Sequence, residues 1–300
     1  MCFGVLGVDG SGKTTILKMM TAETTPTSGD ASIQGISLTS DTKRYVSKIG
    51  YCPQTNPLMD ELTGREMLAL IASLRGISGY DSEVLIDQWI SFLKMEKYQH
   101  RFCSTYSNGS KRKLCTALAL LGNPKVVFLD EPTTDLDPVS TRRLHDIIKK
   151  CKSAGLIVVL ASPNMEECEI LCDRLTILVR GVMQCIGTLK DLKKQYAQGY
   201  SVTLKIHYDV TSADETFALE ENMTNVFNPQ YCELIEEQRG LLRYHISDPA
   251  VQWSDLFRNL EDIKNNNPIV EEYIATNTTL DDIFISFSQS EYDPNSSDYY

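Results

Sequence analysis

The sequence has few of the residues and patterns that define membrane spans, disulfide scaffolds or zinc sites. No stretch approaches the roughly 18 uninterrupted apolar residues that a membrane helix needs, so we expect no transmembrane segment in these residues. The nine cysteines are scattered and none forms a C-x-x-C pair, which indicates reduced, mostly buried thiols. Only four histidines occur, none of them near a cysteine pair, so a zinc site has little support.

Basic residues are scarce in the last third of the chain. Residues 1–198 hold 24 Lys and Arg against 21 Asp and Glu, a balance of +3, whereas residues 199–300 hold 5 against 19, a balance of −14. This break predicts a domain boundary near Gly199, and 300 residues suggest about two domains. Because phosphate contacts need basic side chains, the break also argues against nucleic-acid binding by the second domain.

The first chemical feature is a glycine-rich loop near the start. A short apolar strand, Cys2–Leu6, is followed by GVDGSGKTT and then by a helical run. This matches G-x-x-x-x-G-K-[ST] between a strand and a helix, where backbone N–H groups and the helix N-terminus surround phosphates. Lys13 is expected to reach the β- and γ-phosphates, and the Thr14 hydroxyl to hold Mg²⁺. The predicted phosphate-binding residues are Gly7, Val8, Asp9, Gly10, Ser11, Gly12, Lys13, Thr14 and Thr15.

The segment KVVFLDEP, Lys125 to Pro132, predicts the second half of this site. Its four apolar residues form a buried strand of a parallel sheet, with two carboxylates at the carboxyl end. Asp130 is placed to orient Mg²⁺ through its water shell, and Glu131 to polarise an attacking water. Alone, such a pair is often only the end of a strand. Beside a phosphate loop it is the expected partner, because ligands of open α/β sheets collect at the carboxyl ends of strands.

The stretch from Tyr106 to Pro138, YSNGSKRKLCTALALLGNPKVVFLDEPTTDLDP, resembles the nucleotide-binding domain of ABC transporters. In that family, a signature loop, here Ser107, Asn108 and Gly109, contacts the ATP held by the other nucleotide-binding domain. The resemblance assigns Asp137 to the loop that crosses the dimer interface. It also identifies Gln54, in IGYCPQ, as a catalytic and Mg²⁺-sensing residue that couples to the membrane domain.

Further segments resemble the second nucleotide-binding domain and regulatory tail of the A-subfamily lipid transporters. They extend the resemblance to about residue 290, and they are Thr25–Gly35, Gly50–Gln54, Glu61–Gly76, Ser110–Leu114, Met165–Gly181 and Thr278–Phe284.

The resemblance implies a P-loop NTPase of the α/β class, the ABC ATPase type, over residues 1–198. A RecA-like core takes residues 1–57 and 126–190, and a helical lobe takes about 58–125. Two such domains sandwich two ATP molecules with Mg²⁺, and closure of the sandwich drives the membrane domains. The implied partners are the other nucleotide-binding domain and the transmembrane domains of the same transporter, which moves phospholipid or sterol. The implied place is the cytoplasmic face of a membrane.

Residues 199–276 predict a separate α+β domain. The strand, helix, hairpin, helix and strand expected there have the order βαββαβ of a ferredoxin-like fold; they span Tyr200–Tyr208, Ala213–Phe227, Cys232–Ser247, Val251–Asn266 and Pro268–Thr276. No catalytic constellation occurs there, so a regulatory or dimer-stabilising domain and a plain acidic cap are both open. Residues 277–300 are expected to form a short docking helix, with Ile283, Phe284 and Phe287 on a partner surface, and a disordered tail.

Three departures from the family pattern bear on activity. The signature loop has Asn108 and Ser110 where the family has Gly and Gln or Asn; Asn tolerates left-handed backbone, so we expect weaker closure rather than none. Pro163 replaces the switch histidine that contacts the γ-phosphate and the catalytic Glu, which suggests low turnover. The chain also starts at the phosphate-loop strand, without the family's upstream β-subdomain, and so resembles a C-terminal fragment or a truncated gene model.

Three functions therefore remain open at the level of sequence. The first is an ATP-hydrolysing module that powers lipid transport, which the intact Glu131 favours. The second is a degenerate, largely non-hydrolysing ATP-dependent clamp in the same transporter, which Pro163 and Asn108 favour. The third is a soluble ABC protein with no part in transport. The transported lipid, its direction and the membrane lie beyond what these residues encode.

Overall fold

The computed structural model describes residues 1–196, 199–207, 213–238, 240–279 and 282–285, and the chain divides into two compact units. The first unit is Met1–Ile186 and the second is Gly187–Tyr300. The division thus comes before the charge break at Gly199, because helix α8 (Leu189–Tyr196) groups with the second unit. Among the described residues, no helix combines the length and the apolar character needed to span a membrane.

A six-stranded sheet forms the centre of the first unit. Its strands, in spatial order, are β4 (Ile49–Cys52), β5 (Val126–Asp130), β6 (Ile157–Ser162), β1 (Cys2–Leu6), β7 (Arg174–Val179) and β8 (Val182–Thr188). The pairings from β4 to β7 are all parallel. β5 is buried at every position, as its apolar run predicts. Parallel strands bring their carboxyl ends to one edge, so the loops after β1, β4, β5 and β6 gather there.

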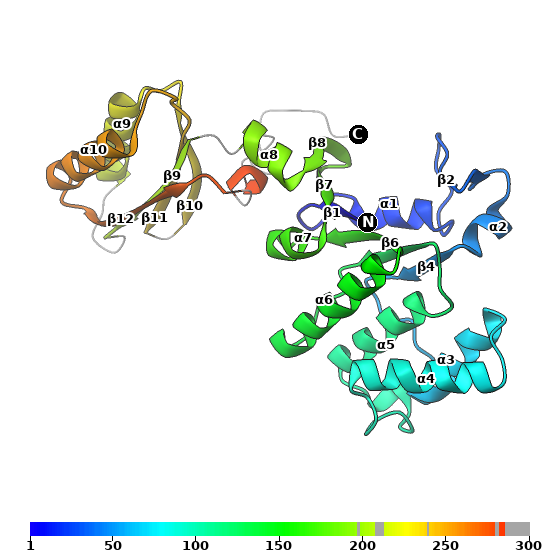
Figure 1. Cartoon of the computed structure of the whole chain (residues 1–300). Coiled ribbons are helices and arrows are strands. Elements are labelled where there is room, and N and C mark those ends of the chain that lie inside the picture. Colours follow the sequence, from blue (N-terminus) through cyan, green and yellow to red (C-terminus); the bar gives the residue numbers. More distant parts are fainter. Residues whose placement is uncertain (197–198, 208–212, 239, 280–281, 286–300) are drawn as a thin grey trace. The chain divides into compact units, whose positions relative to one another are not determined.

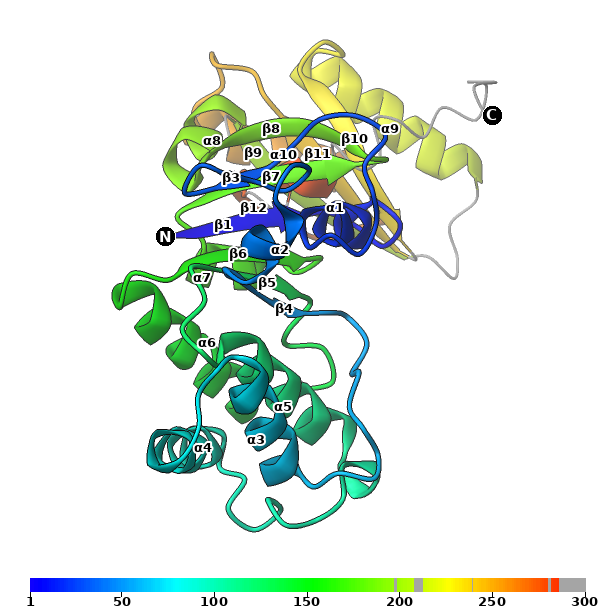
Figure 2. The same cartoon turned by 90° about the vertical axis from the view of Figure 1, so that its right-hand side faces the viewer.

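The remaining elements of this unit connect or cover that sheet. They are α1 (Lys13–Met20), β2 (Ser32–Ile33), β3 (Ile36–Ser37), α2 (Thr42–Val46), α3 (Gly64–Leu74), α4 (Tyr80–Leu93), the 3-10 turn η1 (Cys103–Thr105), α5 (Asn108–Leu120), α6 (Pro138–Ser153) and α7 (Met165–Leu171). Figures 1 and 2 both show α3, α4 and α5 gathered at one end of this unit, within the segment assigned to the helical lobe. All the cysteines are free and all but Cys151 are buried, which confirms the reduced, mostly buried thiols expected.

Helix α5 joins these helices to the sheet because it packs directly on β4. A Cβ at Gly50 would lie 1.9 Å from the carbonyl oxygen of Ala119, so only glycine permits this approach. At the other end of the lobe, Thr63 and Glu66 form a reciprocal capping box that starts α3. The position of α5 is therefore fixed by backbone packing, and this helix begins at the signature loop.

The second unit has a four-stranded antiparallel sheet with two helices on one face. After α8 come β9 (Tyr200–Ile206), α9 (Ala213–Phe227), β10 (Cys232–Gln238), β11 (Leu241–Ile246), α10 (Trp253–Asn266) and β12 (Val270–Asn277), with the strands in the spatial order β10-β11-β9-β12. Leu219 of α9 and Leu260 of α10 share one core with Leu204 and Leu242 of the sheet. The order of elements is the one that the sequence predicts, although the first strand ends two residues before Tyr208.

The segment after β12 lies on the other face of that sheet. Asp282, 1% exposed, accepts hydrogen bonds from Ser201 of β9 and from Thr279, and it pairs with Arg243 of β11 at 2.6 Å. The predicted docking segment is thus anchored on the sheet of its own unit. Ile283 is also buried, whereas Phe287 and the tail lie outside the described residues.

Candidate functional site

The loop between β1 and α1 has the backbone that a phosphate cradle needs. Gly10 and Gly12 have φ values of 82° and 101°, in the left-handed region that favours glycine. Ser11 donates its N–H to the Val8 carbonyl at 3.1 Å, which closes the loop before the helix begins. Gly12 is the N-cap residue of α1 and has no side chain to cap the helix. The first N–H groups of α1 therefore stay available to an anion.

Lys13 is buried, and its ammonium group folds back over the loop. Nζ donates to the carbonyl of Gly7 at 2.8 Å and to that of Val8 at 3.1 Å. It also lies 3.8 Å from the carboxylate of Glu131, and the two side chains are 4% and 10% exposed. The ammonium group is therefore already held at the mouth of the cradle, where a phosphate oxygen would take the place of a loop carbonyl.

Asp130 and Glu131 lie at the carboxyl end of β5, and each is unusual. Asp130 is fully buried, and neither of its carboxylate oxygens has a hydrogen-bond partner among the described residues. Burial raises its pKa, and the neighbouring Thr14 hydroxyl opposes that shift. Glu131 has a φ of 48°, a left-handed conformation that costs a non-glycine residue about 1–2 kcal/mol. Strain and an unpartnered buried carboxylate mark this end of the strand as built for a ligand.

Residues from both predicted halves line one cavity of about 320 Å³, although Gly7, Val8, Ser11 and Asp130 are not among them. Its walls are Asp9, Gly10, Gly12, Lys13, Thr14, Thr15, Gln54 and Glu131. Gln54 follows β4 and is exposed, so its amide is open to solvent. Asp130 is buried and directly precedes the cavity residue Glu131 in the chain. Two glycines with positive φ, a buried ammonium group and an orphaned carboxylate fit a magnesium-bound triphosphate, with Thr14, Gln54 and Asp130 as the residues that would hold the ion directly or through water.

The signature loop begins α5 and has a simpler backbone than the sequence suggested. Ser107 is the N-cap residue and its Oγ accepts the N–H of Ser110 at 3.2 Å. Asn108 is the first helical residue and has no positive φ, so the tolerance of Asn for left-handed backbone is not used. A Cβ at Gly109 would lie 3.0 Å from the Asp135 carbonyl, which makes glycine the residue that fits this close approach.

Asp137 caps α6, the helix that follows β5. Its carboxylate accepts the N–H groups of Val139 and Ser140, both at 3.0 Å, and the Ser140 hydroxyl at 2.5 Å. These bonds, that of the hydroxyl first, lower the pKa of Asp137. Asp137 is exposed, and its place in a dimer interface stays a prediction.

Pro163 lies between β6 and α7 at the carboxyl edge of the sheet. Asn164 caps α7 through its side chain, which accepts the N–H of Glu167 at 3.1 Å. The carboxylate of Glu167 does not complete a capping box. It instead accepts the Ser162 hydroxyl at 2.7 Å and contacts Nε2 of His145 at 3.3 Å. Pro163 is exposed and is not among the residues that line the phosphate cavity.

The buried network of Ser162, Glu167 and His145 was not foreseen from the sequence, because His145 comes from α6, twenty-two residues before Glu167. Their exposed fractions are 1%, 3% and 7%. The network fixes the strand end that precedes Pro163. A polar residue at the end of an apolar strand was the only local signal.

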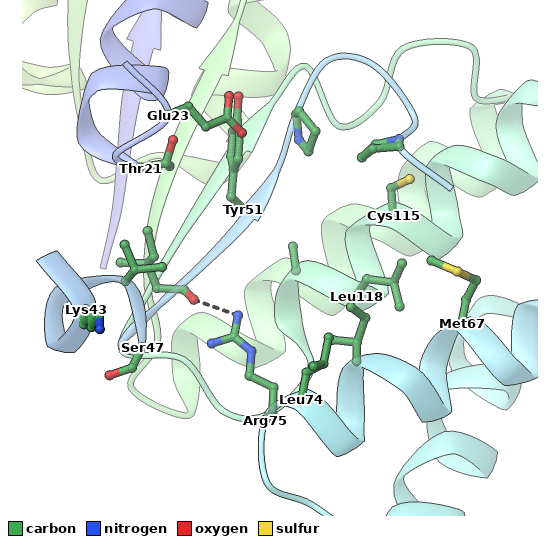
Figure 3. Close-up of a pocket in the computed structure, with 16 residues that line it drawn as sticks. Thr21, Glu23, Lys43, Ser47, Tyr51, Met67, Leu74, Arg75, Cys115 and Leu118 are labelled. Carbon is green, nitrogen blue, oxygen red and sulfur yellow. Dashed lines mark hydrogen bonds between the residues drawn. The ribbon is translucent and has the colours of Figure 1, made fainter. Parts of the chain in front are cut away.

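A larger groove, of about 700 Å³, lies between the sheet and the helical lobe (Figure 3). Its apolar wall includes Met67, Leu74 and Leu118, and its polar rim includes Lys43 and Glu23. Arg75, which also lines the groove, donates from its guanidinium to the carbonyl of Ile49 at 2.8 Å, and Figure 3 draws this bond as a dashed line. Pro53 lines the same groove, so the groove reaches the segment that carries Gln54.

Comparisons with known proteins agree with this geometry. Residues 1–134 match the family model described as ABC transporter. The chain is 40% identical over 288 residues to the phospholipid-transporting ATPase ABCA3 of Mus musculus, which is 96% of this chain and 17% of that protein. It is also 40% identical over 292 residues to the retinal-specific phospholipid-transporting ATPase ABCA4 of Bos taurus, which is 97% of this chain and 12% of that protein.

Solved structures give the same result for the fold. An ATP-binding subunit of an ABC transporter matches with a TM-score of 0.62 and 28% identity, over 72% of this chain and 86% of that one. A dimeric post-hydrolysis ATP-binding cassette bound to ADP and Pi matches with a TM-score of 0.58 and 23% identity, over 62% and 84%, and shows the fold alone.

The chain thus spans less than a fifth of the length of the curated relatives it matches. The matches nevertheless confirm the family predicted from the motifs. We conclude that the chain contains an ABC transporter domain with a P-loop α/β fold, and that its relatives are A-subfamily phospholipid-transporting ATPases.

Proposed function

We propose that the first unit binds MgATP and hydrolyses it as one nucleotide-binding domain of a membrane transporter for phospholipid or sterol. The observation that carries the proposal is the meeting of Lys13, Glu131 and Gln54 around one cavity, together with the unpartnered carboxylate of Asp130, the residue before Glu131. Similarity to phospholipid-transporting ATPases supports the lipid as substrate. The unit would then work at the cytoplasmic face of the membrane.

Each residue has a distinct task in this proposal. Bound magnesium neutralises charge on the phosphate oxygens. Lys13, now bonded to two loop carbonyls, would bind phosphate oxygens, and Asp130 would help to hold the ion, directly or through water. Glu131, at the end of β5, would accept a proton from a water that bonds to the γ-phosphorus as the bond to the departing ADP breaks. Gln54 closes the opposite side of the cavity.

The partners are a second nucleotide-binding domain and the membrane domains of the same transporter. The exposed Ser107 and Asn108, with Gly109, would contact the nucleotide of the second domain, and the exposed Asp137 would lie at that interface. The apolar groove of Figure 3 is proposed to receive a cytoplasmic segment of a membrane domain, because one of its lining residues, Pro53, directly precedes Gln54. Leu118→Asp should then leave nucleotide binding by the chain intact and lower lipid transport by the whole transporter.

The second unit is proposed to be a ferredoxin-like regulatory or dimer-stabilising domain. Its βαββαβ order and its sheet order, β10-β11-β9-β12, support that fold. The core between the helices and the sheet is apolar, and we assign no chemistry to it.

A non-hydrolysing clamp is the second candidate, and Pro163 is the observation that favours it. Proline offers neither a side-chain donor nor an N–H to developing phosphate charge. The two functions separate in a whole transporter whose other nucleotide-binding domain carries a disabled catalytic glutamate. Residual phosphate release that Glu131→Gln abolishes would support hydrolysis at this site. Retained ATP binding with no phosphate release would support the clamp. Absence of ATP binding by the wild-type chain would contradict both functions.

A further inference from the structure

Arg112 is the most deeply buried basic side chain among the described residues of the first unit. It lies in the second turn of α5 and is 1% exposed. Its guanidinium donates to three backbone carbonyls, those of Pro53, Gln54 and Asp130, and the bond to Gln54 measures 3.3 Å. One side chain of the signature helix thus contacts both segments that carry the proposed magnesium-sensing and catalytic residues.

The bond to the Asp130 carbonyl acts on Glu131, because this carbonyl belongs to the peptide group that joins the two residues. The N–H of the same peptide donates to Ala161 of β6 at 2.9 Å. The peptide is therefore held from both sides, by Arg112 and by a neighbouring strand. This fixed plane maintains the left-handed backbone of Glu131, whose φ is 48°. A non-glycine residue keeps such a backbone only where its surroundings over-determine it.

The same face of α5 is joined to β4 along its length. Arg112, Thr116 and Ala119 recur at helical spacing, so they share a face. The Thr116 hydroxyl lies 3.7 Å from the Cys52 thiol, and the Ala119 carbonyl packs on Gly50. Together with the bonds of Arg112, these contacts connect α5, the helix that begins at the signature loop, to the ends of β4 and β5.

A purely structural role does not require an arginine at this place. Burying a charge costs several kcal/mol, and apolar residues of similar volume replace buried ionic groups with little loss or with a gain. The guanidinium Nε also has no hydrogen-bond partner among the described residues. The charge instead supplies three carbonyl bonds, to Pro53, Gln54 and Asp130, which lie at or next in sequence to the cavity residues Gln54 and Glu131.

We propose that Arg112 is a positioning residue that fixes Gln54 and Glu131 relative to the signature helix, so that both address magnesium-bound ATP. The inference rests on the proposed function, since the ligand is MgATP. It predicts a specific split. Loss of Arg112 weakens the magnesium-dependent part of nucleotide binding, and it spares the part that the phosphate loop supplies alone.

The experiment is equilibrium binding of TNP-ATP to the chain, with excess Mg²⁺ and with EDTA. The variants are R112M, which removes every donor, R112K, which keeps the charge and one nitrogen, and K113M, a half-buried lysine on the same helix as the matched control. Hydrogen bonds from charged groups are worth about 1.5–3 kcal/mol, so R112M should lose roughly tenfold or more in affinity with Mg²⁺. The affinity of R112M in EDTA should stay within about twofold of wild type. With Mg²⁺, the affinity of R112K should lie between those of R112M and wild type, and that of K113M should equal wild type.

An equal loss with and without Mg²⁺, or no loss, in folded R112M would overturn the proposal. If R112M does not fold, R112K carries the same comparison. If the wild-type chain binds TNP-ATP in neither condition, the proposed function fails, and hydrogen exchange then decides the positioning role separately. Faster exchange of residues 53–58 and 129–134 in R112M or R112K, but not in K113M, supports it, and unchanged exchange overturns it.

Discussion

At the scale of single residues, the buried side chains of Lys13, Arg112 and Asp130 at the candidate site are each compensated differently. Lys13 has two loop carbonyls and, at 3.8 Å, the carboxylate of Glu131. Arg112 has three backbone carbonyls from two other segments, those of Pro53, Gln54 and Asp130. Asp130 has no hydrogen-bond partner for its carboxylate among the described residues. Of the three, Asp130 is the group whose compensation must come from a ligand, and it should therefore lower stability when no ligand is present.

Asp130→Asn should consequently raise the stability of the nucleotide-free chain at neutral pH. The folded pKa of Asp130 lies above the ordinary value of 3.8, mainly through burial. Between the ordinary pKa, which holds in the unfolded chain, and the higher pKa of the folded chain, the folded chain binds more protons than the unfolded chain. The free energy of unfolding therefore falls as the pH rises through that window. The uncharged side chain of the Asp130→Asn variant removes this pH-dependent loss of stability. Each kcal/mol gained in the free energy of unfolding raises Tm by about 2–4 °C. Thermal unfolding at pH 7 measures the gain, which should vanish towards pH 3.

The same variant should lose its response to magnesium. Wild-type chain with ATP should gain further thermal stability on addition of Mg²⁺, whereas Asp130→Asn should not. An unchanged response would contradict the assignment of Asp130 to the ion.

Pro163→His should raise ATP turnover if the missing donor limits hydrolysis. A single donor to developing transition-state charge is typically worth about 10²–10³ in rate. The loop accepts the change, since Pro163 is exposed and Asn164, not proline, caps α7. Phosphate release by the whole transporter measures the effect, with Pro163→Ala as the control for the loss of proline itself. Equal rates in both variants would show that another step, such as closure at Asn108, is limiting.

At the scale of elements, the local signals were enough for the phosphate loop and the buried strand β5, because glycine spacing and apolar runs act within a few residues. They were not enough for Arg112. The sequence SKRKL gives three basic residues in a row, and only the packing of α5 on Gly50 decides which one is buried. The Asn164–Glu167 spacing likewise predicts a capping box, whereas the tertiary partner His145 draws the Glu167 carboxylate away.

That competition makes Glu167 a structural residue for the end of β6. Glu167→Ala leaves the Ser162 hydroxyl and the His145 ring buried without this partner, at a cost of about 1–3 kcal/mol for each group. Glu166→Ala, on the exposed side of the same helical turn, should change stability by less than about 0.5 kcal/mol. Urea unfolding of the two variants measures the difference as a shift in the transition midpoint. Equal midpoints would mean that the network contributes nothing net.

At the scale of the whole molecule, two cores stand in two units, and the tryptophans are divided between them. The sequence has two tryptophans, Trp89 in α4 of the first unit and Trp253 in α10 of the second. Trp89 is 8% exposed, whereas Trp253 is 37% exposed and packs beside Tyr200 and Phe257. Each unit therefore carries its own fluorescent reporter of unfolding.

The single-tryptophan variants Trp89→Phe and Trp253→Phe should show that MgATP stabilises the first unit selectively. A ligand that binds only the folded state adds RT ln(1 + [L]/Kd), about 2.7 kcal/mol at a hundredfold excess over Kd, and it adds this to the unit that holds the site. The residues that line the phosphate cavity all belong to Met1–Ile186. The transition reported by Trp89 should thus move upward with MgATP, while that reported by Trp253 stays in place, and Lys13→Ala should abolish the first shift. Equal shifts of both reporters would show instead that the two units unfold as one cooperative body, so that nucleotide binding at the phosphate loop stabilises the acidic second unit as well.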